Sequence, residues 1–109
     1  SNRSLKIGGR LGIHTGKAKI ISSVSGILEE YDIEIIKANY QAKSSDKSLV
    51  IRVKDERLLN LTGGIVQGMS GSPIVQDGKL VGAVIHVFLN DPTKGYGIYS
   101  DWMLEQLDF

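Results

Sequence analysis

The 109-residue sequence has no cysteine, only two prolines and almost no net charge. The absence of cysteine excludes a disulfide scaffold and a zinc–thiolate site. Lys and Arg total 13 against 12 Asp and Glu, a formal charge of +1, so nothing electrostatic favours a nucleic acid or an anionic membrane as partner. The most apolar stretch, 80–89, is interrupted by Gly82 and His86 and is much shorter than the ~20 residues of a membrane span. No cofactor motif is present, so we expect no cofactor.

Glycine is abundant, with 13 residues, and this composition predicts many turns in one domain with a modest core. Polar and apolar residues alternate in 31–35, which is the pattern of a half-buried strand. The Asp77-Gly78 pair is a strong signal for a hairpin turn. Strands are predicted at 17–24, 31–35, 49–53, 73–76, 79–88 and 96–99.

Two short helical segments are also predicted. Asp55 is a suitable N-cap for one helical turn over 55–59, and Ser100 for a terminal helix over 101–107. Asp101 is favourable at the positive end of that terminal helix. Many short strands with one closing helix predict an all-β protein, an antiparallel Greek-key-like barrel with a short C-terminal helix.

The loop 68–73 carries the most informative residues, Gly-Met-Ser-Gly-Ser-Pro. A nucleophilic serine needs a tight turn that exposes its hydroxyl, and nearby backbone N–H groups to bind the oxyanion. Glycines close to Ser70 permit such a turn, and the amides of Gly68 and Ser70 are the natural oxyanion donors. Glycine–serine loops are also common as plain turns, so the loop alone leaves both interpretations open.

The residues around this loop are much more specific. A strand, a turn and a second strand follow Ser70, as they follow the nucleophile in chymotrypsin-like peptidases. The sequence resembles the SpoIVB peptidase family, the stage IV sporulation peptidases of spore-forming Firmicutes. The residues that carry this resemblance lie at 31–35, 55–59, 63–74, 82–88, 90–93, 95–97 and 102–104.

The resemblance implies a fold like the C-terminal barrel of a two-barrel chymotrypsin-like serine endopeptidase, with a protein or peptide as substrate and partner. It also implies secretion from the forespore into the space between forespore and mother cell. There the family cuts itself during maturation and cuts a regulator of a membrane protease complex, which leads to activation of the late mother-cell sigma factor. By the same resemblance, the nucleophile is Ser70 and the triad aspartate is Asp55. Asp55 alone has the simpler interpretation of a helix N-cap.

The resemblance places the catalytic histidine in an upstream segment that 1–109 does not contain, together with a PDZ domain. We therefore expect this chain to be the C-terminal portion of a peptidase domain, inactive alone. His14 lies in a glycine-flanked polar stretch and is expected in a surface loop. His86 is a substrate-cleft candidate. Ile85 stands where the family usually has a small hydroxyl residue, which would help to hold the aspartate.

A second interpretation is a non-catalytic peptide-binding barrel or degenerate paralogue, which the missing histidine and Ile85 favour. The intact loop and Asp55 favour the enzyme. Asp32 and Glu34 share one strand face and are expected to be solvated rather than a catalytic carboxylate pair. The stretch 90–92 is expected to be a turn rather than a metal site.

Overall fold

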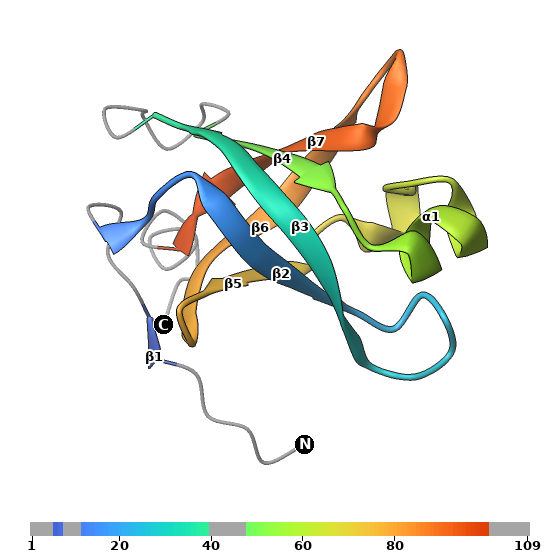
Figure 1. Cartoon of the computed structure of the whole chain (residues 1–109), viewed down its shortest axis with the longest axis horizontal. Coiled ribbons are helices and arrows are strands. Elements are labelled where there is room, and N and C mark those ends of the chain that lie inside the picture. Colours follow the sequence, from blue (N-terminus) through green and yellow to red (C-terminus); the bar gives the residue numbers. More distant parts are fainter. Residues whose placement is uncertain (1–5, 8–11, 40–47, 101–109) are drawn as a thin grey trace.

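The computed structural model describes residues 6–7, 12–39 and 48–100. Within these residues the chain forms strands, one α-helix and one 3-10 turn (Figure 1). In chain order they are β1 (Lys6–Ile7), β2 (Gly16–Ser22), β3 (Glu29–Ala38), β4 (Leu49–Val53), α1 (Glu56–Thr62), η2 (Gln67–Met69), β5 (Pro73–Gln76), β6 (Lys79–Phe88) and β7 (Asp91–Tyr99).

Strands β2 to β7 close into an antiparallel barrel. The strand order is β1-β6-β5-β2-β3-β4-β7, and an additional pairing of β6 with β7 joins the two sides. Three consecutive strands, β2, β3 and β4, are followed by a connection that returns the chain to β5, beside β2. This is the Greek-key arrangement, so the predicted barrel is confirmed. The short β1 pairs with β6 in parallel.

The barrel interior follows from the alternation in its strands. In β3, Tyr31, Ile33 and Ile35 are buried while Asp32 is exposed and Glu34 is intermediate. Successive side chains of a strand point to opposite faces, so the apolar set enters the core. The core also takes Ile20 from β2, Leu49 and Ile51 from β4, Ile74 from β5, Val84 from β6 and Tyr99 from β7.

The Asp77-Gly78 hairpin joins β5 to β6 as predicted, and both turn residues have positive φ, 54° and 74°, as a type I′ turn requires. The last strand is longer than predicted, because β7 begins at Asp91 and passes through Pro92. Proline normally argues against a strand interior. Here it lies near the strand's start, where the pairing with β6 is irregular.

Asp55 is the N-cap of α1, as predicted, and the helix is longer than the expected single turn. Gly63 ends it in the left-handed conformation, at φ 77°. The α-helix of the described residues, α1, therefore lies in the middle of the chain and is not the predicted C-terminal helix. The helix predicted at 101–107 lies outside the described residues.

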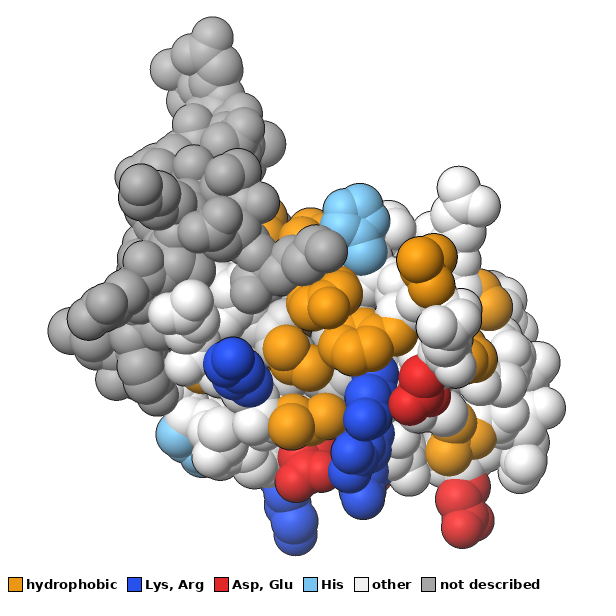
Figure 2. All heavy atoms as spheres, turned by 90° about the horizontal axis from the view of Figure 1, so that it is seen from above, with side chains coloured by type: hydrophobic (Ala, Val, Ile, Leu, Met, Phe, Trp, Pro, Cys, Tyr) orange, Lys and Arg blue, Asp and Glu red, His pale blue; other side chains and the backbone are white. Residues whose placement is uncertain are grey.

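The outer surface carries apolar patches and charges of both signs. Figure 2 shows hydrophobic side chains gathered on one face, with basic and acidic side chains next to one another beside them. This interspersed pattern fits the nearly neutral sequence and presents no field of a single sign on that face. In the described part of the chain, no helix is long and apolar enough to cross a membrane.

Candidate active site

Ser70 lies at the end of the connection from β4 to β5. The chain leaves α1 through Gly63 and reaches the 3-10 turn η2, whose last residue, Met69, is 1% exposed and packs in the core. The next residue, Ser70, is exposed. A buried anchor directly before an exposed serine fixes where the hydroxyl emerges from the barrel.

Hydrogen bonds to β6 hold the chain on the other side of Ser70. Gly71 has a φ of 89°, a left-handed conformation that glycine adopts without strain. Its N–H donates to the Val84 carbonyl at 2.7 Å, and the Val84 N–H donates to the Ser72 carbonyl at 2.9 Å. The Ser70 hydroxyl donates to the Ile85 carbonyl at 3.3 Å. The serine is therefore presented beside the middle of β6.

The predicted oxyanion donors are not both free in this conformation. The Ser70 N–H donates to the Gln67 carbonyl at 3.1 Å, within the 3-10 turn. An oxyanion can accept from this amide only after the Gln67 carbonyl moves away. The neighbouring Gly68 is exposed, and a Cβ built on it would meet no atom within 4 Å. Nothing in the present conformation therefore requires glycine at this position.

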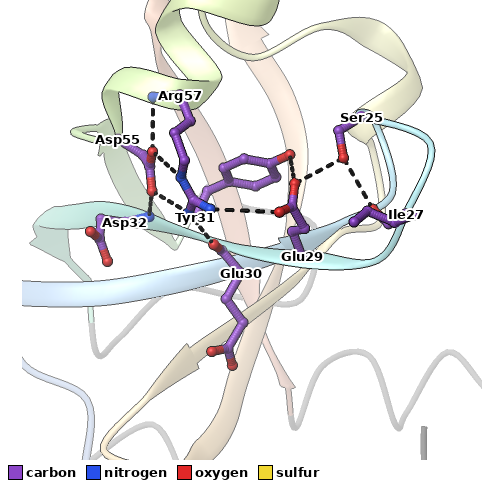
Figure 3. Close-up of polar contacts among 8 residues, drawn as sticks. All are labelled: Ser25, Ile27, Glu29, Glu30, Tyr31, Asp32, Asp55 and Arg57. Carbon is purple, nitrogen blue, oxygen red and sulfur yellow. Dashed lines mark hydrogen bonds and ion pairs between the residues drawn. The ribbon is translucent and has the colours of Figure 1, made fainter.

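Asp55 is buried, with 7% of its surface exposed, and its carboxylate accepts hydrogen bonds from two directions (Figure 3). Oδ1 accepts from the Arg57 backbone N–H at 3.0 Å and from Arg57 Nε at 3.1 Å. Oδ2 accepts from Arg57 Nη2 at 2.9 Å and from the Asp32 N–H at 3.0 Å. These bonds, the Arg57 side-chain bonds above all, lower the pKa of Asp55 well below its ordinary value.

Arg57 joins the start of α1 to the start of β3. Its guanidinium lies 3.6 Å from the Glu29 carboxylate, donates to the Glu30 carbonyl at 2.8 Å and lies over the Tyr31 ring at 5.1 Å (Figure 3). Glu29 also accepts from the Ser25 and Tyr31 hydroxyls, both at 2.9 Å. Hydrogen bonds from Ser25 and Tyr31 lower the Glu29 pKa. The network thus reaches from α1 into the β2–β3 loop.

Sequence reasoning missed Arg57. Its place two residues after an N-cap is not a specific signal, and its partner Glu29 is far away in the sequence. The antiparallel pairing of β3 with β4 brings the two side chains together.

The two histidines lie apart from any described contact with Ser70. His14 is exposed, as predicted, just before β2, and its Nε2 lies 2.9 Å from Asp77 Oδ2. Bonds to the Thr15 carbonyl and to Asp77 raise the pKa of His14. His86 is exposed on β6, opposite Tyr96 of β7. Its assignment to a substrate cleft stays a prediction.

Ile85 supplies a backbone contact rather than the side-chain hydrogen bond that a hydroxyl residue would give. Its carbonyl accepts from Ser70, while Asp55 takes its hydrogen bonds from Arg57 and from the Asp32 amide. Arg57 and the Asp32 amide therefore hold the Asp55 carboxylate, and a hydroxyl at position 85 is not needed for this.

The exposed carboxylates do not form a second site. Asp32 pairs with Lys19 at 3.6 Å and Glu34 with Arg52 at 3.9 Å, as expected for a solvated strand face. Among the described residues, no group of three His, Cys, Asp or Glu side chains is arranged to hold a metal ion.

Comparison with known proteins identifies the family. The model of the SpoIVB peptidase S55 family matches residues 1–104. This chain belongs to that family. The match confirms the resemblance seen in the sequence, and members of the SpoIVB peptidase family are serine peptidases. No curated protein matches the chain.

A solved structure confirms the fold. A crystal structure of Rv3671c from M. tuberculosis H37Rv, a serine-to-alanine mutant in its inactive form, matches with a TM-score of 0.63 and 14% identity. The match covers 94% of this chain and 50% of that one. At this identity the likeness concerns the fold alone, and this SpoIVB-family chain spans half the length of the protein it matches.

Proposed function

We propose that this chain supplies the nucleophile of a serine endopeptidase, with Ser70 attacking the carbonyl of a peptide bond. The observation that carries the proposal is the presentation of Ser70, exposed between the buried Met69 and a left-handed glycine, in a family of serine peptidases. The base that accepts the Ser70 proton comes from the upstream segment of the peptidase. The chain alone is therefore expected to have little or no activity.

Strand β6 offers a place for the substrate backbone. Strand β5 pairs with β6 only over 79–83, whereas β7 pairs with it as far as Phe88. On the side of β5, Val84 is still bonded to Gly71 and Ser72, and beyond Val84 no strand of the described residues pairs with this edge of β6. An extended peptide can add to such an edge through main-chain hydrogen bonds. His86 lies next to Ile85 on this part of β6 and would border the bound peptide.

Catalysis also requires a local rearrangement. When the Gln67 carbonyl turns away from the Ser70 amide, the amides of Gly68 and Ser70 become available to an oxyanion. Losing one such donor typically slows catalysis by about 100- to 1000-fold. The resemblance assigns Asp55 to the triad as well. Because that carboxylate already accepts four hydrogen bonds, the proposal depends on Ser70 and not on Asp55.

The family points to a biological role. We place the substrate among protein regulators of a membrane protease complex in sporulation signalling, outside the cytoplasm, between forespore and mother cell. The upstream peptidase segment and a PDZ domain would be partners of this barrel. Family membership supports this role.

A fluorophosphonate probe tests the proposal, because it labels a serine only when a base and an oxyanion hole activate it. We expect labelling of the protein that includes the upstream segment, its loss in Ser70→Ala, and very slow labelling of residues 1–109 alone. Rapid labelling of the isolated chain would contradict the requirement for an external base.

A peptide-binding barrel without catalysis is the second candidate, favoured by the engaged Ser70 amide. In that case the longer protein binds peptide with equal affinity before and after Ser70→Ala and never reacts with the probe. Labelling that depends on Ser70 decides against it.

A further inference from the structure

The proposed reaction fixes where one residue of the substrate must lie. Ser70 Oγ attacks a carbonyl carbon from about 3–3.5 Å, and this hydroxyl donates to the Ile85 carbonyl at 3.3 Å. The substrate residue that bears the attacked carbonyl, called the acyl residue below, therefore lies beside Ile85, between β6 and the segment 65–69 that precedes Ser70. Its side chain must fit against the walls that these two parts of the chain form.

The segment 65–69 is bound to β7 at its start. The Ile65 N–H donates to the Pro92 carbonyl at 2.7 Å. Directly before it, Gly64 has a φ of 137° and passes so close to β7 that a Cβ built on it would clash with the Pro92 carbonyl. Glycine is required here both by the conformation and by the contact. The position of Ile65 relative to β7 is therefore fixed.

Ile65 fills the interior of the barrel at this end. Its side chain is 3% exposed and belongs to the hydrophobic core. A Cβ built on Gly95 of β7 would lie 2.7 Å from Ile65 Cδ1 and 2.9 Å from the His86 carbonyl oxygen, well inside the ~3.5–4.0 Å of a normal contact between carbon atoms. Ile65 thus reaches the place where β7 pairs with β6, and no methyl group fits between Ile65 and Gly95.

Two valines complete an apolar wall next to Ser70. Val66 follows Ile65, and Val87 of β6 pairs with Gly95. Both valines are partly exposed and pack against the core. A large acyl side chain directed at this wall would displace groups that are already close-packed, which is unfavourable. A charged one would lose its water without gaining a partner from these apolar side chains.

We propose that Ile65 is a specificity-determining residue, which restricts the acyl residue to a small uncharged side chain, and that Gly95 provides the room that Ile65 occupies. The substrate is thus a protein cut after a residue no larger than valine. This inference rests on the function proposed above, because it concerns which carbonyl Ser70 can reach. The residue before the acyl residue is not restricted in this way, since successive side chains of an extended peptide point to opposite faces.

Peptides that differ only at the acyl residue test the size limit, with the peptidase that includes this chain and the segment bearing the base. For the parent, kcat/KM should be at least about 100-fold higher with alanine than with phenylalanine at this position. Ile65→Ala should lower this ratio by about tenfold or more. A parent that prefers phenylalanine, or a ratio that Ile65→Ala leaves unchanged, would overturn the proposal.

Ile33→Ala is the matched control. Ile33 is as deeply buried as Ile65, at 2% exposed, but it lies on β3, which pairs with β2 and β4 and not with β6. Both variants lose the same atoms from the core, and urea denaturation should show a loss of stability in both. The ratio of two kcat/KM values does not depend on the fraction of folded enzyme. An equal change of the ratio in Ile33→Ala would therefore assign it to a loosened core and contradict the role of Ile65.

Ile65→Val removes one methylene group and covers the case in which Ile65→Ala does not fold. It should lower the ratio of alanine to leucine peptides in the same direction by a smaller factor, and an unchanged ratio would count against the proposal.

Ser70→Ala separates this inference from the proposed function. Activity that survives Ser70→Ala, or a parent protein without activity, contradicts the peptidase function and the size limit with it. Cleavage that depends on Ser70 but favours large acyl residues leaves the function standing and overturns the size limit alone.

Discussion

The two ends of the connection between β4 and β5 are held in different ways. At its start, the buried Asp55 carboxylate accepts four hydrogen bonds and pairs with a guanidinium. At its end, the exposed Ser70 makes a backbone bond of 3.1 Å inside a single 3-10 turn and a hydroxyl bond of 3.3 Å. Met69 and the bonds of Gly71 and Ser72 to Val84 hold the chain on both sides of Ser70, so what can rearrange is the Gln67–Ser70 turn itself. A loop that must admit a peptide and then bind an oxyanion needs this combination.

The largest expected effect is that of Ser70→Ala, at the end of the connection. In the peptidase with its base, the rate of peptide cleavage should fall by about 10⁶-fold. The free energy of unfolding should change by less than ~0.5 kcal/mol, because an exposed hydroxyl with one long hydrogen bond contributes little. Peptide cleavage and urea denaturation measure the two effects. A large loss of stability would mean that the Ser70 hydroxyl contributes to holding the loop, contrary to its exposure and its single long hydrogen bond.

Gly68→Ala should have the next largest effect, and on the rate alone. A Cβ at Gly68 meets nothing in the present conformation, so stability should stay equal or rise by up to ~1 kcal/mol. Catalysis should slow by about 100-fold or more, because the rearranged turn that frees the Ser70 amide is expected to need the freedom of glycine.

Gly71→Ala is the matched control for the effect of Gly68→Ala on stability. Gly71 has a φ of 89°, so a side chain there should cost about 1–2 kcal/mol of stability. An unchanged kcat in Gly68→Ala would mean that the oxyanion donors are arranged without turning the peptide bond between 67 and 68.

The comparison of the two ends also shows what the sequence could reveal. Local features were predictable: the alternation in 31–35, the Asp77-Gly78 turn, the Asp55 N-cap and the loop around Ser70. Each depends on a few neighbouring residues and on steric rules that act at short range.

Features that depend on how strands pair in space could not be predicted. The ion pair of Arg57 with Glu29 joins residues far apart in the chain. Likewise, the buried Gln76 side chain donates to the carbonyls of His14 and Lys17, where β2 and β5 diverge. The 3-10 turn that engages the Ser70 amide was also missed, because the same glycine-rich sequence permits an open and a closed turn.

The stabilisation that Asp55 provides at the start of the connection should be lost in acid. The folded-state pKa of Asp55 is well below its ordinary value of 3.8, so the unfolded chain binds more protons between these two pKa values. Stability contributed by Asp55 is therefore complete above about pH 5 and falls as the pH drops toward the folded-state pKa. Asp55→Asn should cost about 2 kcal/mol at neutral pH.

Urea denaturation from about pH 7 down to pH 2 measures this dependence. The difference in free energy of unfolding between Asp55→Asn and the parent should become smaller as the pH falls. Glu29 and Asp91, whose pKa values are also lowered, act in the same direction and remain in both proteins. If this difference stays constant with pH, the charge of Asp55 does not stabilise the folded chain.

The smallest effect is expected away from both ends, at His14. The bonds to Thr15 and Asp77 raise its pKa in the folded state, so its stabilising contribution is complete below the unfolded value of about 6.5 and is lost as the pH rises through the folded value. His14→Ala should therefore lower Tm by no more than about 2 °C at low pH and by less above neutral pH. Thermal denaturation at two pH values measures this. An effect on kcat as well would show that the His14–Asp77 pair is coupled to the Ser70 loop, which no described contact supports.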